Sequence, residues 1–416
     1  MHILFVHQNF PGQYPHLART LIKAGHRVIA IGGPTSRALP GVQLYRYNPS
    51  PSTAIPNCHQ WVRDWQIKCL RGEAVGRLMS QLKSSGLMPD LIIGHPGWGE
   101  LLCAKDIFEQ TPVLHHVEYV YQLKGGDVGF DPEMARSDAD WRAKVMLRIR
   151  RAPQLLALQD LDWGWAPTQW QASTAPEEYA HRLSVVHEGI DTNSISPKQG
   201  STLSLNRAGL HFKPGDEVIS YASRGLEPYR GFHVFMRMLA ILQRFRPNMH
   251  TIIVGGEKES YGRPPLSGLS WKQELLKELN GYLDLSRIHF VGQISHSVLH
   301  DLFRVSSCHI YLTYPFVLSW SMLEAMACGA IVIGSNTEPV REVIRNGENG
   351  ILVDFFDTEA MAKTIASVLS KPDAYQHMRS AARQTIIDSY ELNSICLPRQ
   401  IEMINRLVCS SSSLTS

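Results

Sequence analysis

The sequence lacks any apolar stretch near the roughly 18 residues that a membrane-spanning helix requires. Its amino terminus, MHILFVHQNFPG, has no basic segment followed by a long apolar run, which argues against a secretory signal peptide. The net charge of +3 is too small to indicate nucleic acid as a partner. These absences predict a cytoplasmic protein whose only membrane contact is peripheral, on the inner face.

The chain also lacks a disulfide framework. Its seven cysteines are odd in number, and no two have C-x-x-C spacing, so reduced thiols are expected. Charged residues make up only 19% of the chain and hydrophobic residues 44%, which permits a substantial core. The length of 416 residues suits about two domains of ~150–200 residues each.

Short apolar runs alternate with helical spacing along the chain, as is typical of doubly wound α/β domains. The first set has strands at 2–6, 27–31, 91–93 and 113–114, a helix at 16–24, and a strand that closes on a turn at 184–191. A polar stretch with Pro197, Gly200 and several serines follows. We therefore predict an amino-terminal domain over residues 1–195.

A second α/β set is predicted over residues 196–385. Its strands are expected at 218–221, 251–254, 288–291, 308–312 and 330–334, and its helices at 232–245, 361–369 and 375–390. Residues 386–416 are expected to form a carboxyl-terminal helix, which packs back towards the first domain, and a polar tail. Two α/β sets of similar plan predict a ligand site in a cleft between them.

The segment 307–354 has the most specific pattern in the chain. A strand runs into a short loop and then into a helix that contains Leu-Glu-Ala-Met-Ala-Cys-Gly. Open parallel sheets bind ligands at such loops, and the amino end of a helix suits a phosphate. Glu324 lies on this helix, where it can accept hydrogen bonds from sugar hydroxyls.

Two arginines follow an earlier strand of the same set. Arg224 comes directly after the strand at 218–221, and Arg230 precedes the helix at 232–245. Each guanidinium can hold phosphate oxygens with paired donors. Surface ion pairs are the alternative interpretation of both residues.

The order of these motifs resembles that of the retaining glycosyltransferases of family 4. The shared motifs are Ser-Arg-Gly-Leu-Glu-Pro-Tyr-Arg-Gly, Val-Gly-Gly, Phe-Val-Gly-Gln and Leu-Glu-Ala-Met-Ala-Cys-Gly, and Gly-Ile-Asp at 189–191 matches the family's hinge turn. The resemblance is strongest over 218–354. It implies the GT-B fold, in which two Rossmann-like doubly wound domains face each other across a cleft.

The resemblance assigns roles to several residues of the second set. Arg224 and Arg230 bind the donor diphosphate, and Arg230 stands where the family has lysine. Glu324 is the second glutamate of the family's E-x7-E motif and binds the ribose, while Phe316 replaces the first glutamate and cannot accept hydrogen bonds from the sugar. Other predicted donor-site residues are Gly225, Gly255, the base pocket Gly292, Gln293 and Ile294, and the backbone amides of Leu318, Ser319, Trp320 and Ser321.

The first set supplies candidates at the ends of its strands. Gly12 lets the backbone approach the donor phosphates, and its loop is not G-x-G-x-x-G, which argues against a nicotinamide cofactor. In related enzymes a histidine of this region contacts the transferred sugar, and Glu118 is a candidate to orient the acceptor hydroxyl. The predicted catalytic residues are therefore Arg224, Arg230, His95, His115, His116 and Glu118.

No metal or cofactor is predicted, because arginines and a helix dipole can replace a divalent ion. Two Asp-x-Asp strings, at 138–140 and 160–162, lie in or beside expected helices and are interpreted as solvated charges. The basic run at 142–151 indicates either a solvated helix face or a surface for an anionic membrane or acceptor.

The resemblance implies a metal-independent hexosyltransferase that acts in polysaccharide biosynthesis. It moves a sugar such as glucose from a nucleotide-sugar donor, with UDP chosen on family frequency, to a hydroxyl of a saccharide or lipid-linked acceptor. Two alternatives stay open: a nucleotide-sugar epimerase of GT-B fold, and a nucleotide-sugar-binding protein without turnover. The second alternative is raised by Phe316.

Overall fold

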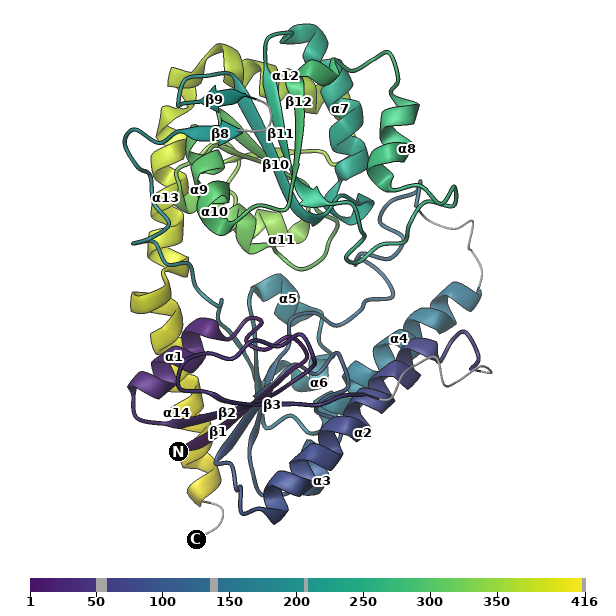
Figure 1. Cartoon of the computed structure of the whole chain (residues 1–416), viewed down its shortest axis with the longest axis vertical. Coiled ribbons are helices and arrows are strands. Elements are labelled where there is room, and N and C mark those ends of the chain that lie inside the picture. The colour runs from purple at the N-terminus through teal and green to yellow at the C-terminus, as the bar shows by residue number, and fades with distance from the viewer. Residues whose placement is uncertain (50–57, 135–140, 206–208, 414–416) are drawn as a thin grey trace. The chain divides into compact units, whose positions relative to one another are not determined.

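The computed structural model describes residues 1–49, 58–134, 141–205 and 209–413 (Figure 1). The chain forms two compact units, one of Met1–Gly189 with Leu392–Ser416 and one of Ile190–Glu391. The chain passes between these units after Gly189 and after Glu391, near the predicted bounds 195 and 385, and helix α13 (Gln376–Tyr390) lies wholly in the second unit. Among the described residues, no helix combines the length and apolar character needed to cross a membrane.

The described part of the first unit is built on a seven-stranded parallel sheet in the order β3-β2-β1-β4-β5-β6-β7. The strands are β1 (His2–His7), β2 (Arg27–Gly32), β3 (Gln43–Arg46), β4 (Leu91–Gly94), β5 (Val113–His116), β6 (Trp163–Ala166) and β7 (Leu183–Val185). The strand order reverses between β1 and β4. The carboxyl ends of these two strands therefore form a topological switch point, where doubly wound sheets bind ligands.

Helices cover both faces of this sheet. They are α1 (Pro15–Lys23), α2 (Arg63–Ser84), α3 (Ala104–Ile107), α4 (Trp141–Gln159), α5 (Gln169–Ser173), α6 (Glu177–Ala180) and α14 (Leu397–Ser413). Because side chains alternate along a strand, Phe5 packs with α1 and α14 on one face, while Leu4 packs with α2 on the other. The carboxyl-terminal helix α14 thus contributes Met403 and Ile404 to the core of the first unit.

The described part of the second unit has a six-stranded parallel sheet in the order β12-β11-β10-β13-β14-β15. The strands are β10 (Val218–Gly225), β11 (His250–Gly256), β12 (Ile288–Gly292), β13 (Cys308–Tyr311), β14 (Val332–Ser335) and β15 (Ile351–Val353), and a small hairpin joins β8 (Leu203–Leu205) to β9 (Leu210–Phe212). The order reverses between β10 and β13, which creates a second switch point.

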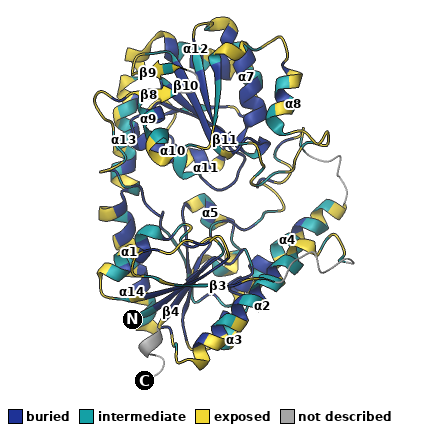
Figure 2. Ribbon diagram, in the orientation of Figure 1, coloured by how far each residue is buried: buried dark blue, intermediate teal, exposed yellow. Residues whose placement is uncertain are grey.

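The helices of the second unit include α7, predicted at 232–245 and observed at Phe232–Phe245. The others are α8 (Trp271–Glu278), α9 (His296–Val305), α10 (Trp320–Ala327), α11 (Glu338–Arg341), α12 (Thr358–Ser370) and α13. The central strands of both sheets are buried, whereas the edge strands β3, β7 and β12 are partly exposed, and the helices expose their outer faces (Figure 2). These two helix-flanked parallel sheets confirm the predicted doubly wound α/β class.

Buried neutral histidines make the fold sensitive to acid. Burial lowers the pKa of His115, in the first unit, and of His309, in the second, to about 3. In the unfolded chain these histidines have a pKa near 6.5 and become protonated at a pH where the folded state keeps them neutral. The free energy of unfolding therefore falls as the pH drops below about 6.5. At pH 5 each of these two histidines lowers the free energy of unfolding by about 2 kcal/mol.

We therefore expect the apparent melting temperatures to fall between about pH 7.5 and pH 5. His309→Asn, which removes one titrating group, should flatten this pH dependence for the second unit, even if it lowers stability at neutral pH. Calorimetric scans across the pH range measure the effect. A variant that loses stability with acid as steeply as the wild type would contradict the assignment.

Candidate functional site

The switch point of the second unit brings three loops together. Strand β10 lies between β11 and β13, so the loops that follow these strands share one edge of the sheet. The predicted residues Arg224 and Gly225 end β10, and Gly255 lies near the end of β11. Gly225 is needed for this packing, because an added Cβ would lie 2.4 Å from the carbonyl oxygen of Lys258.

Arg230 is buried and ties the first of these loops to the loop after β13. Its Nη1 donates hydrogen bonds to Tyr311 Oη at 3.1 Å, Thr313 Oγ1 at 2.8 Å and the Val317 carbonyl oxygen at 3.1 Å. Arg224, by contrast, is exposed. The two predicted phosphate ligands therefore differ: one is part of the structural framework and the other presents its charge to solvent.

Phe316 belongs to an aromatic cluster above Arg230. Its ring makes edge contacts with Tyr229 and Tyr261, with centroids 5.5 Å and 4.9 Å away. The guanidinium carbon of Arg230 lies 5.6 Å from the Tyr261 ring and 6.0 Å from the Phe316 ring, within cation–π range. A phenyl group at this position thus covers a buried cation, which a single neighbouring carboxylate would instead neutralise.

Glu227 is a residue of this region that the sequence analysis missed. Its fully buried carboxylate accepts hydrogen bonds from three successive backbone N–H groups, those of Ser260, Tyr261 and Gly262, at 2.6–3.2 Å. The carboxylate thereby fixes the loop that carries Tyr261. Its place in Gly-Leu-Glu-Pro, directly after a strand, was the available signal.

Helix α10 begins at the same edge. Ser319 caps it by accepting a hydrogen bond from the Ser321 N–H, and the Ser319 N–H itself donates to Tyr311 Oη at 2.8 Å. Two of the four backbone amides predicted to bind the sugar therefore already have internal partners. Of the other two residues, Leu318 buries its side chain in the core of this unit, and Trp320 is half-buried.

Glu324 is buried in the second turn of α10, with 6% of its surface exposed. Its carboxylate oxygens lie 3.9 Å from His296 Nδ1 and 3.6 Å from His300 Nε2 on α9. The sequence analysis did not include these histidines. Glu324 is thus a carboxylate close to the surface whose neighbours are imidazoles.

The predicted base pocket follows β12. Gly292 has a positive φ of 68°, Gln293 is exposed and Ile294 packs on the core. An added Cβ on Gly256 would lie 3.3 Å from Gln293 Nε2, so the loops after β11 and β12 are in contact.

The switch point of the first unit carries a cluster of histidines around one carboxylate. His7 ends β1 and His95 follows β4, so adjacent strands bring them together. Gln13 bridges His7 to Glu118: His7 Nε2 lies 2.7 Å from Gln13 Oε1, and Gln13 Nε2 donates to Glu118 Oε1 at 3.3 Å. His95 Nε2 lies 3.4 Å from the other carboxylate oxygen. His7 and Gln13 were not predicted.

Burial keeps these imidazoles neutral beside an ionised carboxylate. It lowers the pKa of His7 to about 3, an effect reinforced by His95, and it also lowers the pKa of His95. Burial alone would raise the pKa of Glu118, but the polar side chains of His95 and Gln13 that face its carboxylate stabilise the ionised form and bring the pKa down to about 2. The cluster therefore offers neutral donors and acceptors together with one anion, a set suited to hydroxyl groups.

Aromatic rings hold the histidines in place. Trp98 stacks on His95 with ring centroids 3.8 Å apart and meets His7 edge-on at 4.8 Å. Gly12, with φ of +51°, lies against His7, and an added Cβ would come within 2.2 Å of the ring. The glycine is thus required by an imidazole, a neighbour that the sequence did not suggest.

His115 and His116 project to opposite faces of β5, as successive strand residues do. His116 Nε2 lies 2.9 Å from Glu188 Oε1, and its ring stacks on Trp165. His115 is buried, and neither of its ring nitrogens has a hydrogen-bond partner among the described residues. The structure thus brings His116 into the cluster and leaves His115 in the core. Glu188 is a further buried carboxylate that the sequence analysis missed.

The remaining polar motifs lie elsewhere. The string at 138–140 is outside the described residues, whereas Asp162 accepts a hydrogen bond from the Val113 N–H at 2.7 Å and pairs with Lys105 at 2.6 Å. The basic run is part of α4, where Arg142, Lys144 and Arg148 are exposed. Contact of α4 with a membrane stays a prediction.

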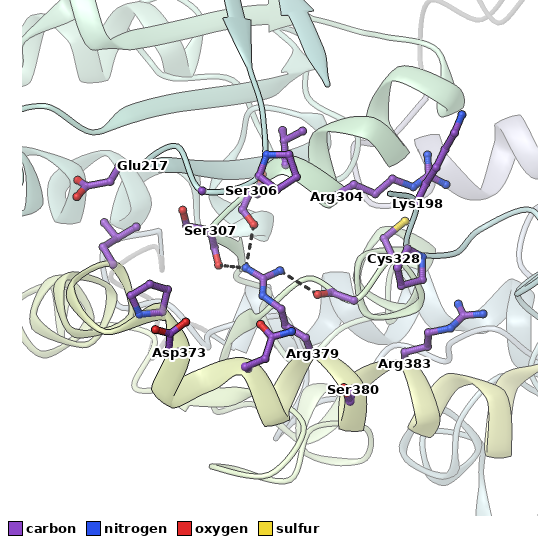
Figure 3. A pocket seen from close by; sticks show the side chains of 18 residues that line it. Lys198, Glu217, Arg304, Ser306, Ser307, Cys328, Asp373, Arg379, Ser380 and Arg383 are labelled. Carbon is purple, nitrogen blue, oxygen red and sulfur yellow. Dashed lines mark hydrogen bonds between the residues drawn. The ribbon is translucent and has the colours of Figure 1, made fainter. Parts of the chain in front are cut away.

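A cavity of about 520 Å³ lies at the opposite edge of the second sheet, beside residues that precede β10 and β13 (Figure 3). Arg379 points into it but donates hydrogen bonds to the carbonyl oxygens of Gly329, Ser306 and Ser307. Of the described residues that line this cavity, none was predicted as a site residue. Its arginines therefore join backbone segments of the unit.

Comparisons with known proteins agree with this arrangement. Residues 24–195 match the family model "Glycosyl transferase family 4 group", and residues 205–385 match "Glycosyl transferases group 1". The D-inositol 3-phosphate glycosyltransferase of Streptomyces scabiei is 27% identical over 295 residues, which cover 70% of this chain and 60% of that protein. The protein of the same name from Rhodococcus jostii is 28% identical over 46% of this chain and 40% of its own length. The matches thus span 60% or less of these two relatives.

Solved structures share the fold over nearly the whole chain. Sucrose-phosphate synthase from Thermosynechococcus elongatus has a TM-score of 0.71 at 18% identity and covers 99% of this chain and 100% of its own. Anabaena HepE, solved in complex with UDP and glucose, has a TM-score of 0.64 at 19% identity. The match covers 98% of this chain and 99% of HepE. At such identities the likeness shows the fold, which is the GT-B type.

The contact between Gly12 and His7 can be tested by mutation. Gly12→Ala places a Cβ against a buried ring at a positive φ, so it should destabilise the first unit by about 2–4 kcal/mol. Gly86→Ala is the matched control, because Gly86 also has a positive φ, of 90°, but nothing lies within 4 Å of the added atom. Thermal unfolding followed by circular dichroism compares them, and equal losses of stability would contradict the close contact.

Proposed function

Because this chain belongs to the family 4 glycosyltransferases with a GT-B fold, we propose that it transfers a hexose from a nucleoside diphosphate donor to a hydroxyl acceptor with retention of anomeric configuration. The observation that carries the proposal is the edge of the second sheet. There Arg230, the amino end of α10 and Glu324 follow the strands of a switch point. A cation and a helix dipole suit the diphosphate, and a carboxylate can accept hydrogen bonds from the ribose hydroxyls of a nucleotide.

In this mechanism the second unit stabilises the leaving diphosphate. Arg224, Arg230 and the amino end of α10 act on the negative charge that grows as the glycosidic bond breaks. The acceptor hydroxyl attacks from the face that the diphosphate leaves, and a phosphate oxygen takes its proton. No protein nucleophile, metal ion or cofactor is required in this scheme.

The first unit is proposed to bind sugar hydroxyls through its histidine cluster. His95 offers a neutral imidazole, His116 offers a second ring beside it, and the ionised Glu118 offers an acceptor. The placement of His115 in the core favours the other two candidates. The acceptor is proposed to be a saccharide or a lipid-linked saccharide of polysaccharide assembly, with α4 as the surface that meets an anionic membrane.

UDP-glucose is the proposed donor. HepE, which shares the fold, was solved with UDP-glucose, and this supports UDP as the nucleotide and glucose as the sugar. Phe316 is the observation that favours a second candidate, a nucleotide-sugar-binding protein without turnover, because it replaces a sugar-binding glutamate by an aromatic group. Epimerisation of the nucleotide sugar is a third reaction that the fold supports.

One experiment separates these functions. The full chain is titrated calorimetrically with UDP, UDP-glucose and a panel of other nucleotide sugars, and each binder is then incubated with and without saccharide acceptors. Release of UDP with a glycosylated acceptor supports transfer, whereas free UDP with an isomerised sugar supports epimerisation. Binding without either product supports a nucleotide-sugar-binding protein without turnover. Failure to bind any nucleoside diphosphate would overturn the enzyme assignment.

The proposed ribose contact of Glu324 predicts a loss of nucleotide affinity on mutation. Glu324→Gln removes charge-assisted hydrogen bonds, so UDP should bind more weakly by about 1–3 kcal/mol. Glu338→Gln is the matched control, because it makes the same change on the exposed face of α11 in the same unit. Calorimetry with UDP gives both dissociation constants, and an unchanged value for Glu324→Gln would remove this residue from the site.

The two arginines should separate in their effects. Arg224→Ala should weaken UDP binding by about 1–3 kcal/mol with little change in the melting temperature, because its side chain is exposed. Arg230→Ala should lower both the affinity for UDP and the melting temperature, because three buried acceptors lose their donor. A normal melting temperature for Arg230→Ala would show that its internal hydrogen bonds contribute little.

A further inference from the structure

Two histidines and one carboxylate form a compact cluster on neighbouring helices of the second unit. His296 and His300 are four residues apart on α9, so they lie on one face of that helix. Glu324 approaches them from α10, and one potential ligand atom from each of the three side chains lies within 4.8 Å of the other two.

The separations suit ligands of one ion better than direct hydrogen bonds. The distances of 3.9 Å from His296 and 3.6 Å from His300 to the Glu324 oxygens exceed those of hydrogen bonds. Ligands held at about 2.0–2.2 Å from a tetrahedral zinc ion lie about 3.4 Å apart. His300 Nε2 is buried and has no hydrogen-bond partner among the described residues, as an unfilled metal ligand would.

The surrounding fold holds two of the three ligands and leaves the third adjustable. Helices α9 and α10 are in contact, and Leu302, Phe303, Met322 and Leu323 join one buried core. The side chains of His300 and Glu324 are 13% and 8% exposed, so packing limits their rotation, while that of His296 is 80% exposed and can turn towards an ion. A small rotamer change then completes the site.

We propose that His296, His300 and Glu324 bind a divalent transition-metal ion of the zinc class. Two imidazole nitrogens and one carboxylate favour zinc, cobalt, nickel or copper over magnesium and calcium, which take oxygen ligands. A fourth position is left to water. This ion is distinct from any that would act on the donor diphosphate, because its ligands lie on α9 and within α10 rather than at the arginines.

The site has a consequence for the nucleotide, which rests on the proposed function. A carboxylate that ligates an ion cannot also accept hydrogen bonds from the ribose, so the ion and the nucleotide exclude each other at Glu324. Zinc then acts as an inhibitor competitive with the donor, and removal of the ion leaves the transferase active.

Binding of the ion is tested without any nucleotide. The full chain, stripped with a chelator, is titrated with Co²⁺ and followed by its visible absorption, and the affinity for Zn²⁺ is obtained by displacement of the cobalt. His296→Ala alters an exposed residue and should weaken binding at least tenfold. His377→Ala, which removes another exposed histidine of the same unit, should bind as the wild type does. Equal affinity in His296→Ala and the wild type, or no tetrahedral cobalt spectrum, would overturn the site.

Competition is measured separately by titrating UDP with and without saturating Zn²⁺. The apparent affinity for UDP should fall at least tenfold in the wild type and in His377→Ala but not in His296→Ala. Unchanged UDP affinity in zinc-loaded wild type would overturn the exclusion. If no variant binds UDP even without zinc, the proposed function fails, whereas the cobalt titration still decides the metal site.

Discussion

The arrangement of the second unit depends on a buried guanidinium. A cation removed from water is stable only if its donors find acceptors, and Arg230 finds three of them in β13 and the loop that follows. The same loop leads into α10, whose Ser319 N–H donates to Tyr311, one of the three acceptors. The position of Arg230 therefore determines where α10 begins, and with it where Glu324 lies.

In the first unit, carboxylates rather than a guanidinium connect the buried polar side chains. Glu118 follows β5 and is joined to His95 directly and to His7 through Gln13. Glu188 plays a similar part for His116 and His187. In each case the anion stabilises the neighbouring polar groups, and burial lowers the pKa of His7, His95 and His187, which keeps these three imidazoles neutral. Both units thus place their polar groups at the edge where the strand order reverses, the position that parallel topology leaves open.

Much of this could be predicted from local sequence. The spacing of Phe232, Phe235, Leu239 and Leu242 located α7, and most of the strands were found because buried parallel strands are continuous apolar runs. The strands β3, β6, β8, β9 and β15 were not predicted. Arg230 and Glu324 were found through motifs that occupy consecutive positions. The passage between units at Glu391 lies beyond the predicted bound of 385, because α13 shows the same helical spacing on both sides of that residue.

The contacts of the site were harder to predict because they join distant positions. Gln13 and Glu118 are 105 residues apart, and only the pairing of β1 with β4 and of β4 with β5 brings their loops together. His7, Glu188 and His300 were missed for the same reason, since nothing next to them in the chain identifies their partners. Gly12 was found, and the structure adds an imidazole neighbour, that of His7, which its place in the chain did not indicate.

The carboxylate of Glu227 has a consequence beyond its own hydrogen bonds. Three successive N–H groups that converge on one anion form a concave nest of the kind that binds free phosphates, and here a side chain of the protein fills it. The loop of Tyr261 is thereby folded before any ligand arrives. The protein itself has therefore already supplied the ordering of this segment, and a molecule that binds against it does not bear that entropic cost.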